Sequence, residues 1–108
     1  MKTNKRVKLG EAECNVVVVN VGDREYRITT MSFGQGREIF KPEADVFESN
    51  CAMVAACLNN ADGGTRTADD IQALPYADGN ALILACLDAC GLRPAAAGEA
   101  KAAQKTDP

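Results

Sequence analysis

Two hydrophobic patterns divide the chain into a strand-rich first third and a helical remainder. The segment ECNVVVVNVGDREYRITTM, residues 13–31, has β-branched and aromatic residues on both sides of Gly22-Asp23, a two-residue loop that suits a tight hairpin. Together with the preceding RVKL, this predicts strands within about residues 6–31. The register across the turn places three pairs on one mostly apolar face: Val21 with Arg24, Val19 with Tyr26, and Val17 with Ile28.

From about residue 44 onwards the periodicity is helical. Four apolar residues recur at spacings of three and four, as on one face of a helix: Phe47, Cys51, Val54 and Leu58. Acidic residues in the first turns of this segment suit the dipole of a helix. These features predict a helix over about residues 44–60.

Two further helices are predicted downstream. Asp70 follows Thr67 at the spacing of a capping box, which predicts a short helix over about residues 67–74. A longer helix is expected over about residues 78–90, with Asp78 as its cap and Gly91 just past its end. Its residues from 81 to 87 are all apolar, so this helix is either buried or used in association.

One upstream segment, SFGQGREIFKP, is ambiguous, and we expect a short or irregular turn there in preference to a helix. Ser32 is a candidate cap for a helix that runs to Phe40. Gly34 and Gly36 each disfavour that helix by about 1 kcal/mol relative to Ala.

Together these elements predict one small α+β domain over residues 1–92. We expect an N-terminal antiparallel β-hairpin or small sheet packed with a C-terminal region of three to four helices, because an isolated hairpin is marginally stable in water. Residues 93–108 are rich in Ala and have no core-forming face, so we expect a flexible C-terminal tail there.

Composition and charge limit the classes of partner. No run of 18 apolar residues is present and the basic N-terminus lacks the apolar stretch of a signal peptide, so we expect a soluble intracellular protein with no membrane partner. Residues 38–92 carry two basic against nine acidic residues. Because a nucleic-acid-binding helical surface needs a basic patch, we expect no nucleic-acid partner.

The sequence offers no catalytic site, no cofactor-binding motif and no clear metal site. The chain has no His, so acid–base and Cys–His catalysis lack their usual partner, and we expect no enzymatic activity. Its five cysteines are an odd number without CxxC spacing, which favours reduced, buried thiols over a disulfide framework. Cys86 and Cys90 lie one helical turn apart, so a metal- or redox-responsive module remains a weaker alternative.

The stretch NNADGGTRTADDIQALP, residues 59–75, crowds acids, amides and glycines together as a calcium-binding loop does. With Gly64 at the sixth position of an EF-hand loop, Ala61 and Gly63 fall at ligand positions and Asp70 replaces the bidentate Glu. With Gly63 at the sixth position, Leu58 becomes the first ligand. Neither register supplies enough ligands, so we interpret the stretch as a turn between two helices whose acids act as caps.

The same stretch belongs to a segment, residues 53–92, that resembles the tail assembly chaperones of long-tailed bacteriophages. The shared pattern is an apolar helix, a D-G turn at Asp62-Gly63, a DDxxAL motif and a helix start at Pro75. REYRITTMSFGQGREI also looks like the N-terminal part of that family. Two departures are Thr65-Arg66, where the family often has an aromatic residue, and the cysteine-rich terminal helix.

The resemblance implies a chaperone that binds the long, helical tape-measure protein and helps recruit tail tube protein in the cytoplasm of the bacterial host, and that is absent from the finished virion. Self-association is also expected. The alternative is a small structural tail or connector component of the virion.

Such a role needs exposed apolar surface. The terminal helix supplies the candidate protein-binding residues, although this helix is an equally good candidate for the centre of the core. The candidates are Leu82, Ile83, Leu84, Leu87 and Leu92.

Overall fold

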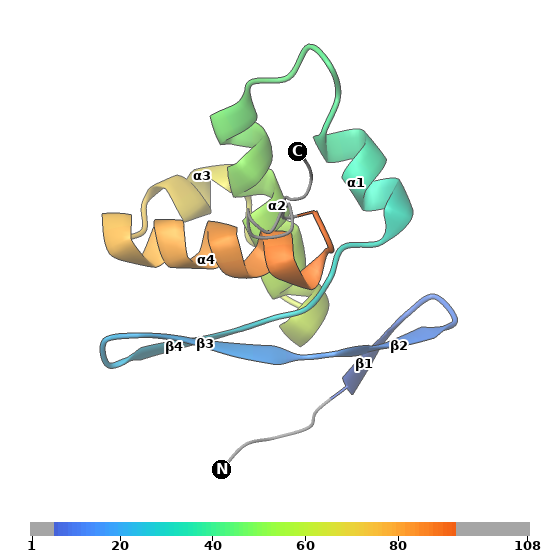
Figure 1. The fold of residues 1–108 in the computed structure, drawn as a ribbon, viewed down its shortest axis with the longest axis horizontal. Coiled ribbons are helices and arrows are strands. Elements are labelled where there is room, and N and C mark those ends of the chain that lie inside the picture. Colours follow the sequence, from blue (N-terminus) through green and yellow to red (C-terminus); the bar gives the residue numbers. More distant parts are fainter. Residues whose placement is uncertain (1–5, 93–108) are drawn as a thin grey trace, which may run out of the picture.

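The structure is a computed structural model that describes residues 6–92, and it confirms the α+β class (Figure 1). Two hairpins come first, formed by β1 (Arg6–Leu9) with β2 (Ala12–Asn15) and by β3 (Val17–Val21) with β4 (Arg24–Ile28). The helices that follow are α1 (Phe33–Ile39), α2 (Val46–Asp62), α3 (Ala68–Gln72) and α4 (Tyr76–Ala89). The expected tail, residues 93–108, lies outside the described residues.

The hairpins form a layer beneath the helices, with α4 running above β3 and β4 (Figure 1). Each hairpin is a separate two-stranded antiparallel sheet. The RVKL segment is a strand, but it pairs with β2 instead of extending the second hairpin. The first residues of the expected long hairpin therefore belong to a different sheet from the rest.

The second hairpin has the register that the sequence predicts, with Val17 opposite Ile28, Val19 opposite Tyr26, and Val21 opposite Arg24. Gly22 has a φ of 62°, a left-handed conformation that a tight hairpin turn requires and that glycine adopts at no steric cost. The apolar face of this hairpin packs on α2 and α4, and Ile28 is fully buried there. The helices thus provide the cover that the hairpin needs.

The cap residues place the starts of α1, α2 and α3. Ser32 caps α1 in a capping box with Gln35, so the segment is a helix and the expectation of an irregular turn is wrong. Asp45 caps α2, and Thr67 caps α3 in the expected box with Asp70. The cap interactions compensate for the two glycines in α1, because they satisfy amide groups that would otherwise lack partners.

The predicted cap of α4 is wrong. The helix begins at Tyr76 after Pro75, and Asp78 lies inside its first turn, where its side chain is fully buried. Pro75 makes no side-chain cap hydrogen bond. The physical reason is that the Asp78 carboxylate is bound by side chains of the second hairpin, as described below.

The core is centred on α2, which contacts β4, α1, α3 and α4. It consists of small and medium-sized apolar side chains, and fully buried members come from three elements: Ile28, Met53, Val54, Cys57, Leu82 and Cys86. The predicted stripe of α2 is buried at Cys51, Val54 and Leu58, but Phe47 at its start is 55% exposed. The first turn of α2 therefore projects beyond the elements that cover the remainder of the helix.

The turn after α2 is closed by its own side chains. Gly63 ends the helix in a left-handed conformation, with φ of 76°. The Asp62 carboxylate binds the Arg66 guanidinium at 2.7 Å, and the Asn59 side chain accepts the Arg66 amide and donates to the Arg66 carbonyl. The polar residues of this stretch are thus occupied in holding a turn, as the sequence predicts.

Candidate protein-binding groove

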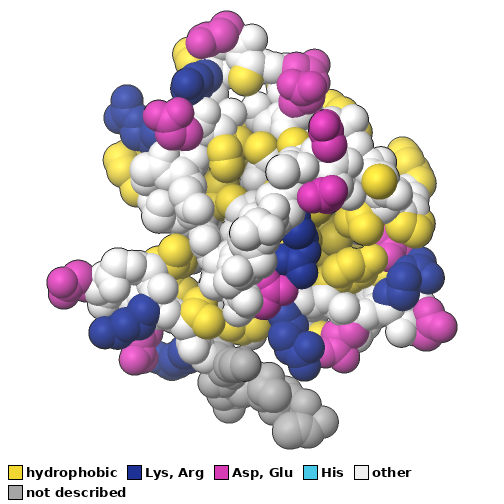
Figure 2. All heavy atoms as spheres, turned by 180° about the vertical axis from the view of Figure 1, so that it is seen from behind, with side chains coloured by type: hydrophobic (Ala, Val, Ile, Leu, Met, Phe, Trp, Pro, Cys, Tyr) yellow, Lys and Arg dark blue, Asp and Glu magenta, His cyan; other side chains and the backbone are white. Residues whose placement is uncertain are grey.

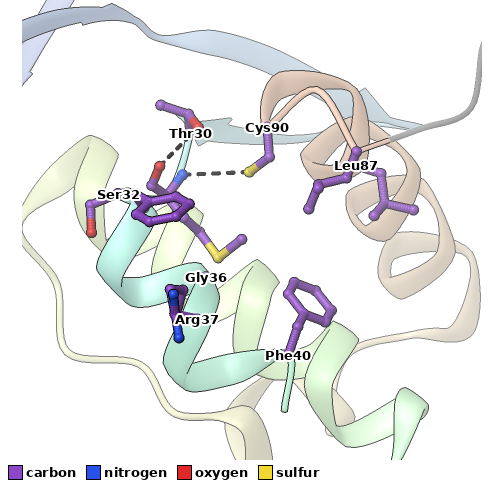
Figure 3. A pocket seen from close by; sticks show the side chains of 10 residues that line it. Thr30, Ser32, Gly36, Arg37, Phe40, Leu87 and Cys90 are labelled. Carbon is purple, nitrogen blue, oxygen red and sulfur yellow. Dashed lines mark hydrogen bonds between the residues drawn. The ribbon is translucent and has the colours of Figure 1, made fainter. Parts of the chain in front are cut away.

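A hollow of about 650 Å³ lies between α1 and the C-terminal end of α4 (Figure 3). Most of its wall is apolar. Phe33 and Phe40 come from α1 and the residue after it, and Leu87 and Cys90 come from α4 and its end. Phe40 and Leu87 lie on opposite sides of this hollow, which we call the groove (Figure 3).

The start of α1 is fixed against α2 by amide side chains. Asn60 on α2 donates to the Gln35 side chain at 2.8 Å and to the Thr30 carbonyl at 3.1 Å. Gln35 in turn accepts the Ser32 amide at 2.9 Å. One wall of the groove is therefore held in place by a hydrogen-bond network between α1 and α2.

The opposite wall is shaped by the end of α4. Gly91 has a φ of 71°, its amide donates to the Asp88 carbonyl, and the Leu92 amide donates to the Leu87 carbonyl at 2.8 Å. This pair of bonds is the Schellman arrangement, which ends the helix and folds the following residue back on the last turn. It brings Leu92 to the groove together with Leu87, and Gly91 ends the helix as the sequence predicts.

All three phenylalanines of the chain are exposed: Phe33 at 82%, Phe47 at 55% and Phe40 at 38%. Two of these three line the groove. A single exposed apolar residue is common, but several large ones around one hollow are typical of a binding surface. The opposite face from Figure 1 also shows hydrophobic side chains between acidic and basic ones (Figure 2).

The structure separates the five residues predicted for protein binding. Leu87 and Leu92 line the groove, whereas Leu84 is half exposed outside it. Ile83 is partly buried against the core. Leu82 is fully buried, so its assignment to a binding surface is wrong: the side chain faces the core, where a partner cannot reach it.

Sequence reasoning missed Phe33 and Phe40 as groove residues. A signal was present, because residues seven apart fall on one face of a helix, and both are aromatic in a chain with few aromatic residues. The signal was weak because α1 could not be distinguished from an irregular turn. Only the tertiary structure places this face opposite the end of α4.

A cluster of charged and polar side chains, formed by Arg24, Tyr26 and Asp78, joins β4 to α4. Arg24 donates from Nε to Asp78 Oδ2 at 2.6 Å and from Nη2 to Oδ1 at 2.7 Å, and the Tyr26 hydroxyl also donates to Oδ2. Arg24 and then Tyr26 hold the pKa of Asp78 at about 2, below its usual 3.8. Because Asp78 is fully buried, we interpret this cluster as a stabilising contact between β4 and α4, and not as a reactive site.

Three thiols gather where α2 meets α4. Cys57 and Cys86 are fully buried, and the Sγ atoms of Cys57 and Cys90 are 3.8 Å apart. Within residues 6–92, no group of three or more His, Cys, Asp or Glu side chains is arranged to hold a metal ion. All five cysteines are free thiols.

No helix among residues 6–92 has both the length and the apolar character that crossing a bilayer requires.

Comparisons with protein-family models, with curated proteins and with solved structures find no match to the chain.

Proposed function

We propose that this chain is a tail assembly chaperone, without enzymatic activity, that binds apolar segments of a helical tape-measure protein in the groove. The observation that carries the proposal is the apolar wall formed by Phe33, Phe40, Leu87 and Leu92 around one open hollow. The sequence resemblance supplies the identity of the partner. Recruitment of tail tube protein, and action in the cytoplasm of the bacterial host, belong to the same proposal.

The groove suits a row of apolar side chains on one face of a helix. A helix presents such side chains at spacings of three, four and seven residues, and an apolar groove is the usual receptor for them. The volume of about 650 Å³ accommodates several side chains and not a whole protein surface. Repeated, weak binding along a long partner follows from a site of this size.

The exposed aromatic residues determine how large a contribution to the binding free energy we expect from each groove side chain. Removing a Phe side chain from water stabilises a complex by about 1.5–3 kcal/mol, which corresponds to roughly tenfold to hundredfold in affinity. Phe33 is almost entirely exposed and makes no contribution to the core. Its substitution therefore reports on binding without disturbing the fold.

The proposal is tested by coexpression of the chain with a tape-measure protein. We expect the chain to raise the soluble fraction of the tape measure, and Phe33→Ser to reduce that effect. Tyr76→Ser is the matched control, because Tyr76 is also aromatic, is also the first residue of a helix, and is 85% exposed outside the groove.

Two results contradict the proposal. One is a tape measure that is no more soluble with the chain than without it, and the other is an equal loss in the Phe33 and Tyr76 variants. Detection of the chain in purified particles points instead to the alternative, a structural tail or connector component.

A further inference from the structure

The thiols of Cys57 and Cys90 face each other across the contact between α2 and α4. Their Sγ atoms are 3.8 Å apart, and the residues are 33 positions apart in sequence. A disulfide bond is about 2.0 Å long, so the two sulfur atoms need to approach by less than about 2 Å.

The two thiols differ in access. Cys57 is fully buried, whereas Cys90 is partly exposed and lines the groove. Cys86, one helical turn before Cys90, is also fully buried. A small oxidant that enters the groove therefore meets Cys90 first and finds Cys57 directly behind it.

We infer that Cys57 and Cys90 form a site of reversible oxidation, in which a hydroperoxide converts the two thiols into a disulfide that joins α2 to the end of α4. The Cys90 sulfur attacks a peroxide oxygen, the O–O bond breaks, and Cys90 becomes a sulfenic acid as one water or alcohol leaves. The Cys57 sulfur then attacks the Cys90 sulfur, the S–O bond breaks, and a water leaves. The two thiols lose two electrons in total, and the hydroperoxide gains them.

The surroundings of both thiols slow their reaction with an oxidant. A hydrogen bond with Cys86 raises the pKa of Cys57 to about 12, and a hydrogen bond with Cys57 raises the pKa of Cys90 above its usual range. Both groups are thus protonated thiols at neutral pH, which react slowly. The site is consequently a slow sensor and not a fast peroxidase centre.

Oxidation alters the groove as well as the core. The Cys90 sulfur accepts the Met31 amide at 3.4 Å, and both residues line the groove. A disulfide draws this sulfur towards α2 and fixes the wall that Leu87 and Leu92 form. The inference concerns the chain by itself and does not depend on the proposed function.

The test uses the purified full chain, reduced and then treated with hydrogen peroxide. A Cys14→Ala background removes the partly exposed thiol on β2, which otherwise allows links between molecules. We expect two fewer alkylatable thiols by intact mass after denaturation, and peptide mapping that joins Cys57 to Cys90. Reductant reverses both changes.

Two matched variants test whether the disulfide joins Cys57 to Cys90 and not to the neighbouring Cys86. Cys90→Ala abolishes the internal link, and Cys86→Ala retains it, with circular dichroism confirming that each variant is folded. In the unsubstituted pair, oxidation also raises the midpoint of thermal unfolding, because a cross-link across 33 residues restricts the unfolded chain.

Three outcomes overturn the inference. They are a mapped Cys57–Cys86 link, an unchanged number of thiols in the folded chain, and a Cys90 that proceeds to sulfinic acid while Cys57 stays alkylatable.

Discussion

At the scale of single residues, Asp78 joins the second hairpin to α4. Its carboxylate is fully buried and bound by Arg24 and Tyr26, which are more than fifty positions earlier in the chain. The Arg24 side chain is half exposed, so the buried group that depends on this cluster is the Asp78 carboxylate, and burying a carboxylate with too few hydrogen-bond partners is costly. Asp78 is therefore important for the stability of the fold, because its buried carboxylate depends on these two partners.

We predict that Asp78→Asn destabilises the fold at neutral pH. The substitution should also make the unfolding free energy depend less on pH in the acid range. The folded pKa of about 2 lies below the ordinary value of 3.8, so this carboxylate stabilises the fold above about pH 4. That contribution is lost as the pH falls from about 4 to about 2. Urea unfolding at several pH values measures the effect.

Glu43→Gln is the control for Asp78→Asn, because Glu43 is exposed between α1 and α2. It removes one carboxylate from the surface and should leave the urea midpoint nearly unchanged. Equal pH dependence of the wild type and the Asp78 variant between pH 4 and pH 2 contradicts the assignment.

At the scale of elements, α4 serves both the core and the surface. Leu82 and Cys86 point into the core, Leu84 is half exposed, and Leu87 with Leu92 borders the groove. A helix that is apolar nearly all round is thereby divided among three environments. This division explains why its composition alone left open whether the helix was buried or used in association.

Two substitutions in α4 test this division. Leu82→Ala should cost about 2–5 kcal/mol of unfolding free energy, since it leaves a cavity in the core. Leu84→Ala should cost about 0.5 kcal/mol or less, because the side chain is half exposed. Chemical denaturation compares them, and equal losses contradict the burial of this helix.

At the scale of the whole molecule, the hairpins and α2 form the scaffold and the groove lies at one side of it. The core takes small and medium side chains, whereas every phenylalanine remains exposed. The exposed phenylalanines are thus separate from the core, whereas Met31 and Leu87 line the groove and also take part in core packing. This separation allows substitution of an exposed phenylalanine to change association without unfolding the chain.

We expect the purified chain to self-associate weakly at high concentration, because the apolar groove is uncovered. Phe33→Ser should shift the population towards monomer, and Tyr76→Ser should shift it less. Sedimentation velocity over a concentration series measures this. A wild-type chain that stays monomeric at every concentration contradicts self-association. Binding of the tape-measure protein is tested separately, by the coexpression experiment.

The sequence by itself determined the α+β class, the register of the second hairpin, the capping box at Thr67, and the glycine stop at Gly91. These features depend on residues close together in the chain, so local patterns specify them. The turn after α2 was predictable for the same reason.

Only the tertiary structure decided how distant faces meet. It places the Asp78 carboxylate on Arg24, buries Leu82 while Leu84 stays half exposed, opposes α1 to the end of α4, and brings Cys57 to Cys90. None of these contacts follows from spacing along the chain, because each depends on the angles at which separate elements pack. The groove exists for that reason: α1 and α4 each present an apolar face, and α2 holds the two faces apart.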